Sequence, residues 1–189
     1  MDTAKVKDLM VPLEEYATVS HRATLYEAVL ELEKAQEGFD KIHTAYQHRA
    51  ILVYDDDKKI IGKISQLDVL TALEPKYGEM GHSRSMSRVA FSPQFLKNMM
   101  QQYSLLSEVF EMLCKKARDV NVKTVMYTPS EGEYVDENAS LTEAIHQFIM
   151  GHHQSLLVTQ GESIVGILRL TDVFREVCHV MKTGSCSLK

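Results

Sequence analysis

The sequence has few cysteines and no pairing pattern among them. Its three cysteines, Cys114, Cys178 and Cys186, are widely spaced and form no CxxC motif. An odd number of separated cysteines predicts neither a disulfide framework nor a zinc site. We therefore expect a protein of a reducing compartment, the cytoplasm.

Long hydrophobic runs are also missing. The longest aliphatic runs are the size of residues 50–53, whereas a membrane-spanning helix needs about 20 apolar residues. The first residues, MDTAKVKDLMVPLEEY, mix charged and apolar side chains and lack the apolar core of a secretory signal. The sequence predicts neither export nor a membrane as partner.

Basic charge and catalytic signatures are scarce as well. Lys and Arg total 21 against 26 for Asp and Glu, and the net charge of −5 argues against nucleic acid as a partner. The eight histidines are scattered. No Ser-His-Asp order, phosphate-binding glycine loop, HExxH or paired-cysteine motif stands out. We therefore do not expect an enzyme.

What is present is the composition of an ordinary folded protein. The chain has 189 residues, of which 44% are hydrophobic and 25% are charged. This length and composition predict one or two globular domains with a sizeable core and argue against disorder.

An internal repeat organises the chain. Residues 6–10 (VKDLM) match residues 122–126 (VKTVM), and residues 23–29 match residues 139–145 at the same offset of 116. Further on, Ile61-Gly62 matches Val165-Gly166 at an offset of 104, so the first copy carries 12 extra residues. Two matches in one register indicate two copies of a single structural unit.

The same elements are predicted in both copies. Helices start after Thr24 and Ser140, each of which has a glutamate three residues later, the signature of a capping box. Each helix is preceded by a short strand and followed by two strands joined by a polar turn, and a second helix begins near Asp68 or Asp172. Two such β-α-β-β-α units, stacked sheet to sheet, would bury a common interior.

This arrangement resembles a tandem pair of cystathionine beta-synthase-type (CBS) domains, a Bateman module. The resemblance is carried by the opening motifs at 6–10 and 122–126, by residues 18–28 and by the segment from Gly62 to Asp68. It implies an α+β fold of two CBS repeats related by a pseudo-twofold axis. The expected divisions are a first repeat, an insert, a second repeat and a C-terminal tail, at residues 1–74, 75–121, 122–178 and 179–189.

The resemblance also implies two clefts between the repeats. In this family each cleft is able to bind an adenosine-containing ligand such as AMP, ADP, ATP or S-adenosylmethionine, in a regulatory role that requires no cofactor. Many members close the repeat with Gly, then Ser or Thr, then an Asp that accepts hydrogen bonds from ribose hydroxyls. The matching residues are Gly62, Ser65 and Asp68 in the first copy, and Gly166, Arg169 and Asp172, with Thr171, in the second.

These aspartates also have a plainer interpretation, because Asp at a helix start is commonly only a cap. Arg169 stands where a small hydroxyl residue is expected. Its forked guanidinium could clamp a phosphate, or it could fill the cleft and block the ligand.

Further contacts are implied by the resemblance. Basic residues before the second strand often face the phosphates, and here these are His48 and Arg49 in the first copy and His152 and His153 in the second. Adjacent strand side chains point to opposite faces, which argues against a metal held by the two neighbouring histidines. Residues that would hold adenine, or that are simply core, are Ala17, Thr18, Ile51, Leu52, Glu133, Tyr134, Leu156 and Leu157.

The insert contains a polar stretch, residues 75–90, which predicts a loop. Ser92-Pro93 is a good helix start, and apolar residues from Leu96 to Ala117 alternate at spacings of three and four. We predict one continuous helix to about Arg118. It would pack on the module's own helices or contact a second copy, and since CBS pairs commonly dimerise, we expect a homodimer.

The sequence thus predicts a regulatory module that binds an adenosyl nucleotide in at least the Asp68 cleft. It would signal through dimer geometry to an unknown effector protein. The alternative is a structural scaffold whose clefts are degenerate and bind nothing.

Overall fold

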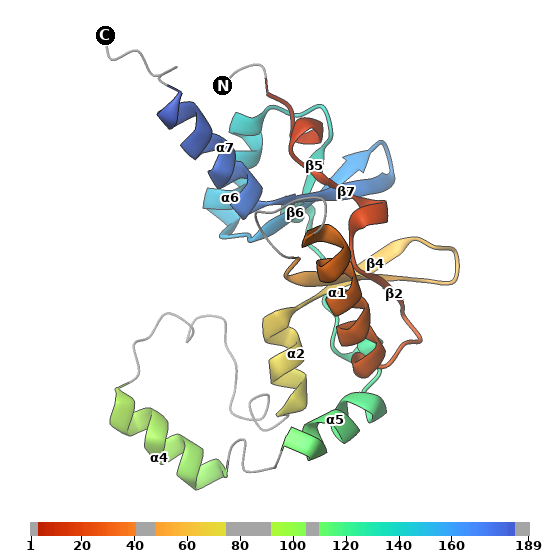
Figure 1. Cartoon of the computed structure of the whole chain (residues 1–189), viewed down its shortest axis with the longest axis vertical. Helices are drawn as coiled ribbons and strands as arrows, with labels where there is room; N and C mark the ends of the chain where they lie inside the picture. Colours follow the sequence, from red (N-terminus) through yellow and green to blue (C-terminus); the bar gives the residue numbers. More distant parts are fainter. Residues whose placement is uncertain (1–3, 41–47, 75–91, 105–109, 184–189) are drawn as a thin grey trace.

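The computed structural model describes residues 4–40, 48–74, 92–104 and 110–183, and Figure 1 shows two small sheets, each covered by helices. The strands are β1 (Val11–Pro12), β2 (Thr18–Ser20), β3 (Ala50–Tyr54), β4 (Ile60–Ser65), β5 (Tyr134–Asp136), β6 (Ser155–Gln160) and β7 (Ser163–Arg169). The α-helices are α1 (Leu25–Asp40), α2 (Gln66–Leu73), α4 (Pro93–Tyr103), α5 (Phe110–Asp119), α6 (Leu141–Gly151) and α7 (Leu170–Lys182).

The predicted repeat is confirmed by the topology of the two sheets. In one sheet β2 runs parallel to β3, which is antiparallel to β4, and in the other β5, β6 and β7 repeat this pattern. Both hairpins carry a register shift at the same place, after Val53 in one and after Val158 in the other. The two copies therefore share strand order, direction and irregularity.

Each copy begins by pairing with the closing strand of the other copy. Val11 of β1 pairs with Ile167 of β7, which makes β1 the fourth strand of the second sheet. At the equivalent place, the backbone of Tyr127 exchanges hydrogen bonds of 3.1 and 3.0 Å with Lys63 of β4. This reciprocal exchange produces the expected pseudo-twofold relation.

The core has three layers, as sheet-to-sheet packing requires. One buried cluster lies between the sheets and draws side chains from both, namely Val11, Tyr16, Ala50, Leu52, Ile60, Leu157 and Ile167. Two further clusters lie between each sheet and its own helices. Each fully buried Leu or Ile stabilises the fold by about 1.5–3 kcal/mol relative to an exposed one.

The helix starts predicted from capping boxes are also confirmed. The Glu27 N–H donates to Thr24 Oγ1 at 3.2 Å, and the Thr24 N–H donates back to the Glu27 carboxylate at 2.7 Å. At the second copy the Glu143 N–H donates to Ser140 Oγ at 3.1 Å. Equivalent local sequences therefore start equivalent helices.

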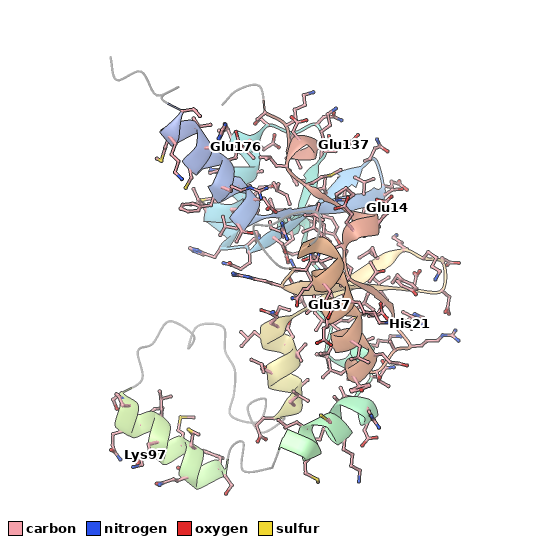
Figure 2. The ribbon with its side chains drawn as sticks, viewed as in Figure 1. Glu14, His21, Glu37, Lys97, Glu137 and Glu176 are labelled. Carbon is pink, nitrogen blue, oxygen red and sulfur yellow. The ribbon has the colours of Figure 1, made fainter. Side chains whose placement is uncertain are left out.

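The prediction of one continuous helix through the insert is wrong. Helix α4 ends at Tyr103, because Ser104 has a left-handed backbone (φ 48°, ψ 44°) through which a right-handed helix cannot continue. A separate helix, α5, begins at Phe110 and contacts α1 and α2. Helix α4, which carries Lys97, lies apart from both sheets (Figures 1 and 2). Residues 105–109 and the predicted loop at 75–90 lie outside the described residues.

Candidate functional site

The pseudo-twofold axis creates two equivalent positions where the repeats meet. Each is headed by the aspartate in the first turn of the second helix of a repeat, Asp68 in α2 and Asp172 in α7. The matching sheet registers identify the equivalent residues, since Ser65 pairs with Ala50 where Arg169 pairs with Ser155. We define the Asp68 site as Ser65, Asp68, Gly132 and His153, and the Asp172 site as Arg169, Asp172, Tyr16 and His48.

Asp68 is held at the start of α2 with one carboxylate oxygen still available. The backbone N–H and the hydroxyl of Ser65 donate to Asp68 Oδ2 at 2.8 and 2.6 Å, and the Asp68 N–H donates to Ser65 Oγ at 3.2 Å. Within the described residues, Oδ1 of this half-buried aspartate has no hydrogen-bond partner. The carboxylate is therefore fixed in place and still able to accept a hydrogen bond.

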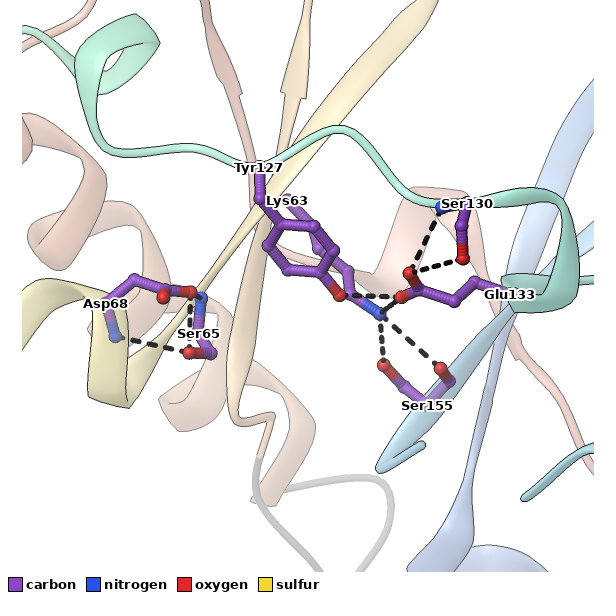
Figure 3. Close-up of polar contacts among 7 residues, drawn as sticks. All are labelled: Lys63, Ser65, Asp68, Tyr127, Ser130, Glu133 and Ser155. Atoms are coloured by element: carbon purple, nitrogen blue, oxygen red, sulfur yellow. Dashed lines mark hydrogen bonds and ion pairs between the residues drawn. The ribbon is translucent and has the colours of Figure 1, made fainter. Parts of the chain in front are cut away.

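A buried polar cluster joins the two repeats beside the Asp68 site (Figure 3). The Lys63 ammonium forms an ion pair with Glu133 at 2.8 Å, and it donates to the carbonyl and hydroxyl oxygens of Ser155 at 3.4 and 3.3 Å. Lys63 and Ser65 are two apart on β4, so their side chains share one face of the sheet. The second repeat therefore lies against β4 next to Asp68.

Glu133 in this cluster stays ionised although it is buried. Burial by itself would raise the pKa of Glu133, but hydrogen bonds from Lys63, Tyr127 and the Ser130 backbone, together with the charge of Lys63, lower it to about 2. The Tyr127 hydroxyl donates to the carboxylate at 2.6 Å. The cluster is thus a neutralised pair of charges within the interface between the repeats.

The Asp172 site is filled by the protein's own side chains. The Arg169 guanidinium donates to both carboxylate oxygens of Asp172, with Nε to Oδ2 at 2.5 Å and Nη2 to Oδ1 at 2.8 Å. Asp172 is only 1% exposed. The buried rings of Tyr16 and His48 meet edge to face with their centroids 4.4 Å apart.

Tyr16 brings the first repeat against this ion pair. Burial is the main cause that raises its pKa to about 12. The positive charge of Arg169 opposes that shift, and the negative charge of Asp172 adds to it, so all three groups interact across the repeat boundary. The sequence left open whether Arg169 would clamp a phosphate or fill the cleft, and in the structure its guanidinium pairs with Asp172.

The Asp68 site lacks the groups that fill the Asp172 site. Ser65 stands where the second copy has Arg169, and Gly132 stands where the first copy has Tyr16. Among the described residues, a Cβ added at Gly132 would have one neighbour within 4 Å, His153 Nε2 at 3.8 Å. Gly132 and His153 thus repeat the arrangement of Tyr16 and His48 without the tyrosine ring. The two positions therefore differ in how much space their side chains occupy.

The residues predicted to face the phosphates differ from one another in their exposure to solvent. Arg49 is exposed and His153 is half-buried, whereas His152 is exposed and ends α6 in a left-handed conformation. The His48 side chain, predicted to face a phosphate, is fully buried against Tyr16.

The predicted adenine-holding residues fall into two groups. The side chains of Ala17, Ile51 and Leu156 belong to the clusters between a sheet and its helices, so only their backbone can face the space between the sheets. Leu52 and Leu157 belong to the cluster between the sheets, and Tyr134 packs against it. Thr18 is half-buried, and Glu133 is in the ion pair with Lys63. Thr171, predicted beside Asp172, is also half-buried.

A surface hollow is lined by Thr18, one of the predicted site residues, but by neither Asp68 nor Asp172. It measures about 340 Å³ and lies between β2, the hairpin of the first sheet and the 3-10 helix at Leu13–Glu15, a segment that includes Glu14 of Figure 2. Its lining residues are Leu13, Glu14, Thr18, Tyr54, Lys58 and Ile60. Thr18 is thus at the hairpin end of the sheet.

Sequence reasoning missed Lys63, Tyr16 and Gly132. The signal that would have found them is a residue-by-residue comparison of the two copies. Lys63 occupies the position that Ile167 holds in the second copy, an apolar position between the sheets. Tyr16 occupies the position that Gly132 holds in the second copy. Such mismatches within a repeat mark where the two halves have different roles.

Among the residues that the structure describes, no three His, Cys, Asp or Glu side chains gather as a metal site requires. No helix in the described part of the chain is long and apolar enough to cross a bilayer.

Comparison with known proteins gives a family and a fold. The family model of the CBS domain matches residues 6–75 and 121–179. No curated protein matches the sequence.

Three similar solved structures illustrate the fold. CBSX2 in complex with AMP is 18% identical with a TM-score of 0.57, and the match covers 93% of this chain and 97% of that one. A CBS domain-containing protein of unknown function from Bacillus anthracis str. Ames Ancestor is 21% identical with a TM-score of 0.59, covering 94% and 95%. The CBS domain of a bacterial CNNM/CorC family Mg²⁺ transporter, in complex with ATP, is 14% identical with a TM-score of 0.57, covering 94% and 89%.

Proposed function

The chain belongs to the CBS domain family, and from this membership we propose that it is a regulatory module that binds an adenosine-containing nucleotide at the Asp68 site. Residues 1–74 and 122–178 would form its two repeats. The AMP and ATP held by CBSX2 and by the transporter domain support an adenine nucleotide as the ligand. S-adenosylmethionine carries the same adenosine group and is included among the candidates.

The observation that carries this proposal is the state of the Asp68 carboxylate. Its Oδ2 is fixed by Ser65, while its Oδ1 has no partner within the described part of the chain. A ribose offers hydroxyl donors, and a hydrogen bond to a carboxylate is stronger than one between neutral groups. Exposed Arg49 and half-buried His153 would supply positive charge and donors for the phosphates.

The test is a thermal-shift and calorimetric panel of AMP, ADP, ATP and S-adenosylmethionine. A ligand at 100 times its Kd should stabilise the parent by about 2.7 kcal/mol. Asp68→Ala should abolish this response, because the ribose would lose its acceptor. The matched control is Glu27→Ala, which removes the corresponding residue of the Thr24 capping box and should bind as the parent does. Binding by Asp68→Ala equal to that of the parent would contradict the proposal.

The Asp172 site favours the scaffold alternative for its half of the molecule. Its carboxylate is fully paired, and its rings and guanidinium are buried. If no member of the panel binds the parent and no adenine nucleotide copurifies with it, the scaffold becomes the better description.

A homodimer is the second part of the proposal. Apolar side chains are exposed at equivalent places on the second helices of the two repeats, with Leu70 on α2 63% exposed and Phe174 on α7 61% exposed. An apolar groove of about 150 Å³ between α6 and α7 adjoins Phe174. Exposed apolar faces of this kind mark association surfaces. Ligand binding would signal by favouring one arrangement of the two protomers.

A further inference from the structure

We infer that each chain binds one nucleotide, at the Asp68 site, because the protein's own side chains permanently occupy the Asp172 site. This inference rests on the proposed function and deepens it. It assigns Arg169 and Tyr16 as the residues that close the second site, whereas the sequence pattern alone makes the two aspartates equivalent.

The first line of support is the hydrogen-bonding capacity of the two carboxylates. Arg169 takes both oxygens of Asp172, and Arg175 approaches Oδ1 as a second cation at 3.6 Å. A ribose hydroxyl is a neutral donor, and to bind Asp172 it would have to displace a bidentate contact with a cation, which is stronger than a single hydrogen bond from a neutral donor. At Asp68 the donors among the described residues come from Ser65, and they leave Oδ1 available.

The second line of support is burial. Arg169 is 6% and Asp172 is 1% exposed. Separating them without moving both into water would leave a buried guanidinium and a buried carboxylate without compensation, which is strongly unfavourable. The pair therefore stays closed in the presence of a nucleotide.

The third line of support is the space that the two rings fill. Tyr16 and His48 are buried and in contact in the Asp172 site, and Tyr16 interacts with the charges of the ion pair. At the equivalent place Gly132 has no ring to set against His153, whose Nε2 lies 3.8 Å from where a Cβ at Gly132 would be. The volume that the Tyr16 ring fills in the Asp172 site is therefore left for a ligand in the Asp68 site, where the equivalent residue is Gly132.

The experiment is the stoichiometry of binding, measured by calorimetry with whichever of AMP, ADP, ATP and S-adenosylmethionine shifts the parent most. The parent should bind one equivalent per chain, and Asp68→Ala should bind none. The double variant Tyr16→Gly, Arg169→Ser gives the Asp172 site the residues of the Asp68 site, and it should bind two equivalents. Adding Asp68→Ala to the double variant should return the value to one.

Two equivalents in the parent, or one equivalent retained by Asp68→Ala, would overturn the inference. Neither measurement depends on the double variant, so poor folding of that variant leaves the test intact. If the parent binds nothing, the proposed function fails. Binding acquired by the double variant would then still support closure of the Asp172 site, and no binding there would overturn it.

Discussion

Lys63 and Glu133 are the residues at which the two repeats differ most sharply in charge. They form an ion pair between the sheets, at positions where the other half has Ile167 and Ala17. Tyr127, which donates to Glu133, stands where the other half has Val11. At these three positions one half of the interface is therefore polar and the other half is apolar. A buried ion pair stabilises little beyond its apolar equivalent, but a broken one costs a great deal.

The single variant Lys63→Ile should destabilise the protein by about 3–5 kcal/mol, because Glu133 would be left buried without its cation. The triple variant Lys63→Ile, Tyr127→Val, Glu133→Ala copies the residues of the other half. Its free energy of unfolding should lie within about 1 kcal/mol of that of the parent, since no buried charge is then left without a partner. Ser155 and Ser130 also lose a partner, but Ser155 is half-buried and Ser130 is exposed, so water can replace it. Urea denaturation measures both free energies of unfolding. A triple variant as unstable as the single one would contradict this account.

The pH dependence of stability follows from the pKa of Glu133. That pKa is about 2 in the folded protein and 4.5 for an ordinary glutamate. A lowered pKa contributes stability above pH 4.5, and this contribution is lost as the pH falls from about 4.5 towards 2. The free energy of unfolding of the parent should therefore fall more steeply across this range than that of the triple variant. Equal slopes in urea denaturation would count against the role of Glu133.

At the scale of elements, the exchange of strands between repeats depends on glycine. Gly166 of β7 and Gly62 of β4 lie where the opening segment of the other copy crosses. A Cβ at Gly166 would lie 2.5 Å from the carbonyl oxygen of Val11, and one at Gly62 would lie 2.7 Å from the Met126 sulfur. The Val11 backbone cannot move aside as easily as the flexible Met126 side chain can.

Gly166→Ala should therefore cost more stability than Gly62→Ala. We expect a loss of about 1–3 kcal/mol for Gly166→Ala, the usual range for overpacking. The Gly62→Ala variant is the matched control and should lose less, because the Met126 side chain can rotate away. Both are compared by chemical denaturation, and the reverse order would refute the explanation.

The helices also show that a feature is predictable from sequence when neighbouring residues alone determine it. The helix starts at Thr24 and Ser140 were predicted correctly because a cap is made within four residues. The helix of the insert was predicted to run too far, because its apolar spacing continues past the break at Ser104. A periodic pattern shows which face of a helix is apolar, but it does not detect a single left-handed residue.

At the scale of the whole molecule, the exposed apolar helix faces predict how two chains meet. Phe174→Asp should convert the proposed homodimer to a monomer, because it places a charge on the apolar face of α7. Sedimentation velocity reads the assembly state directly. The control is Leu96→Asp on α4, which is also exposed, at 46%, and should leave the dimer intact. Dissociation by Leu96→Asp alone would instead place the interface on α4.

The sequence by itself determined the repeat, the family, the class of fold and the two closing aspartates, because each depends on a pattern that recurs along the chain. Only the tertiary structure decided that Asp172 is paired and buried while Asp68 keeps one oxygen without a partner in the described part of the chain. It also decided that Lys63 meets Glu133 across the repeats. These differences arise because each position is completed by residues of the other copy, and the pseudo-twofold packing alone brings such distant residues together.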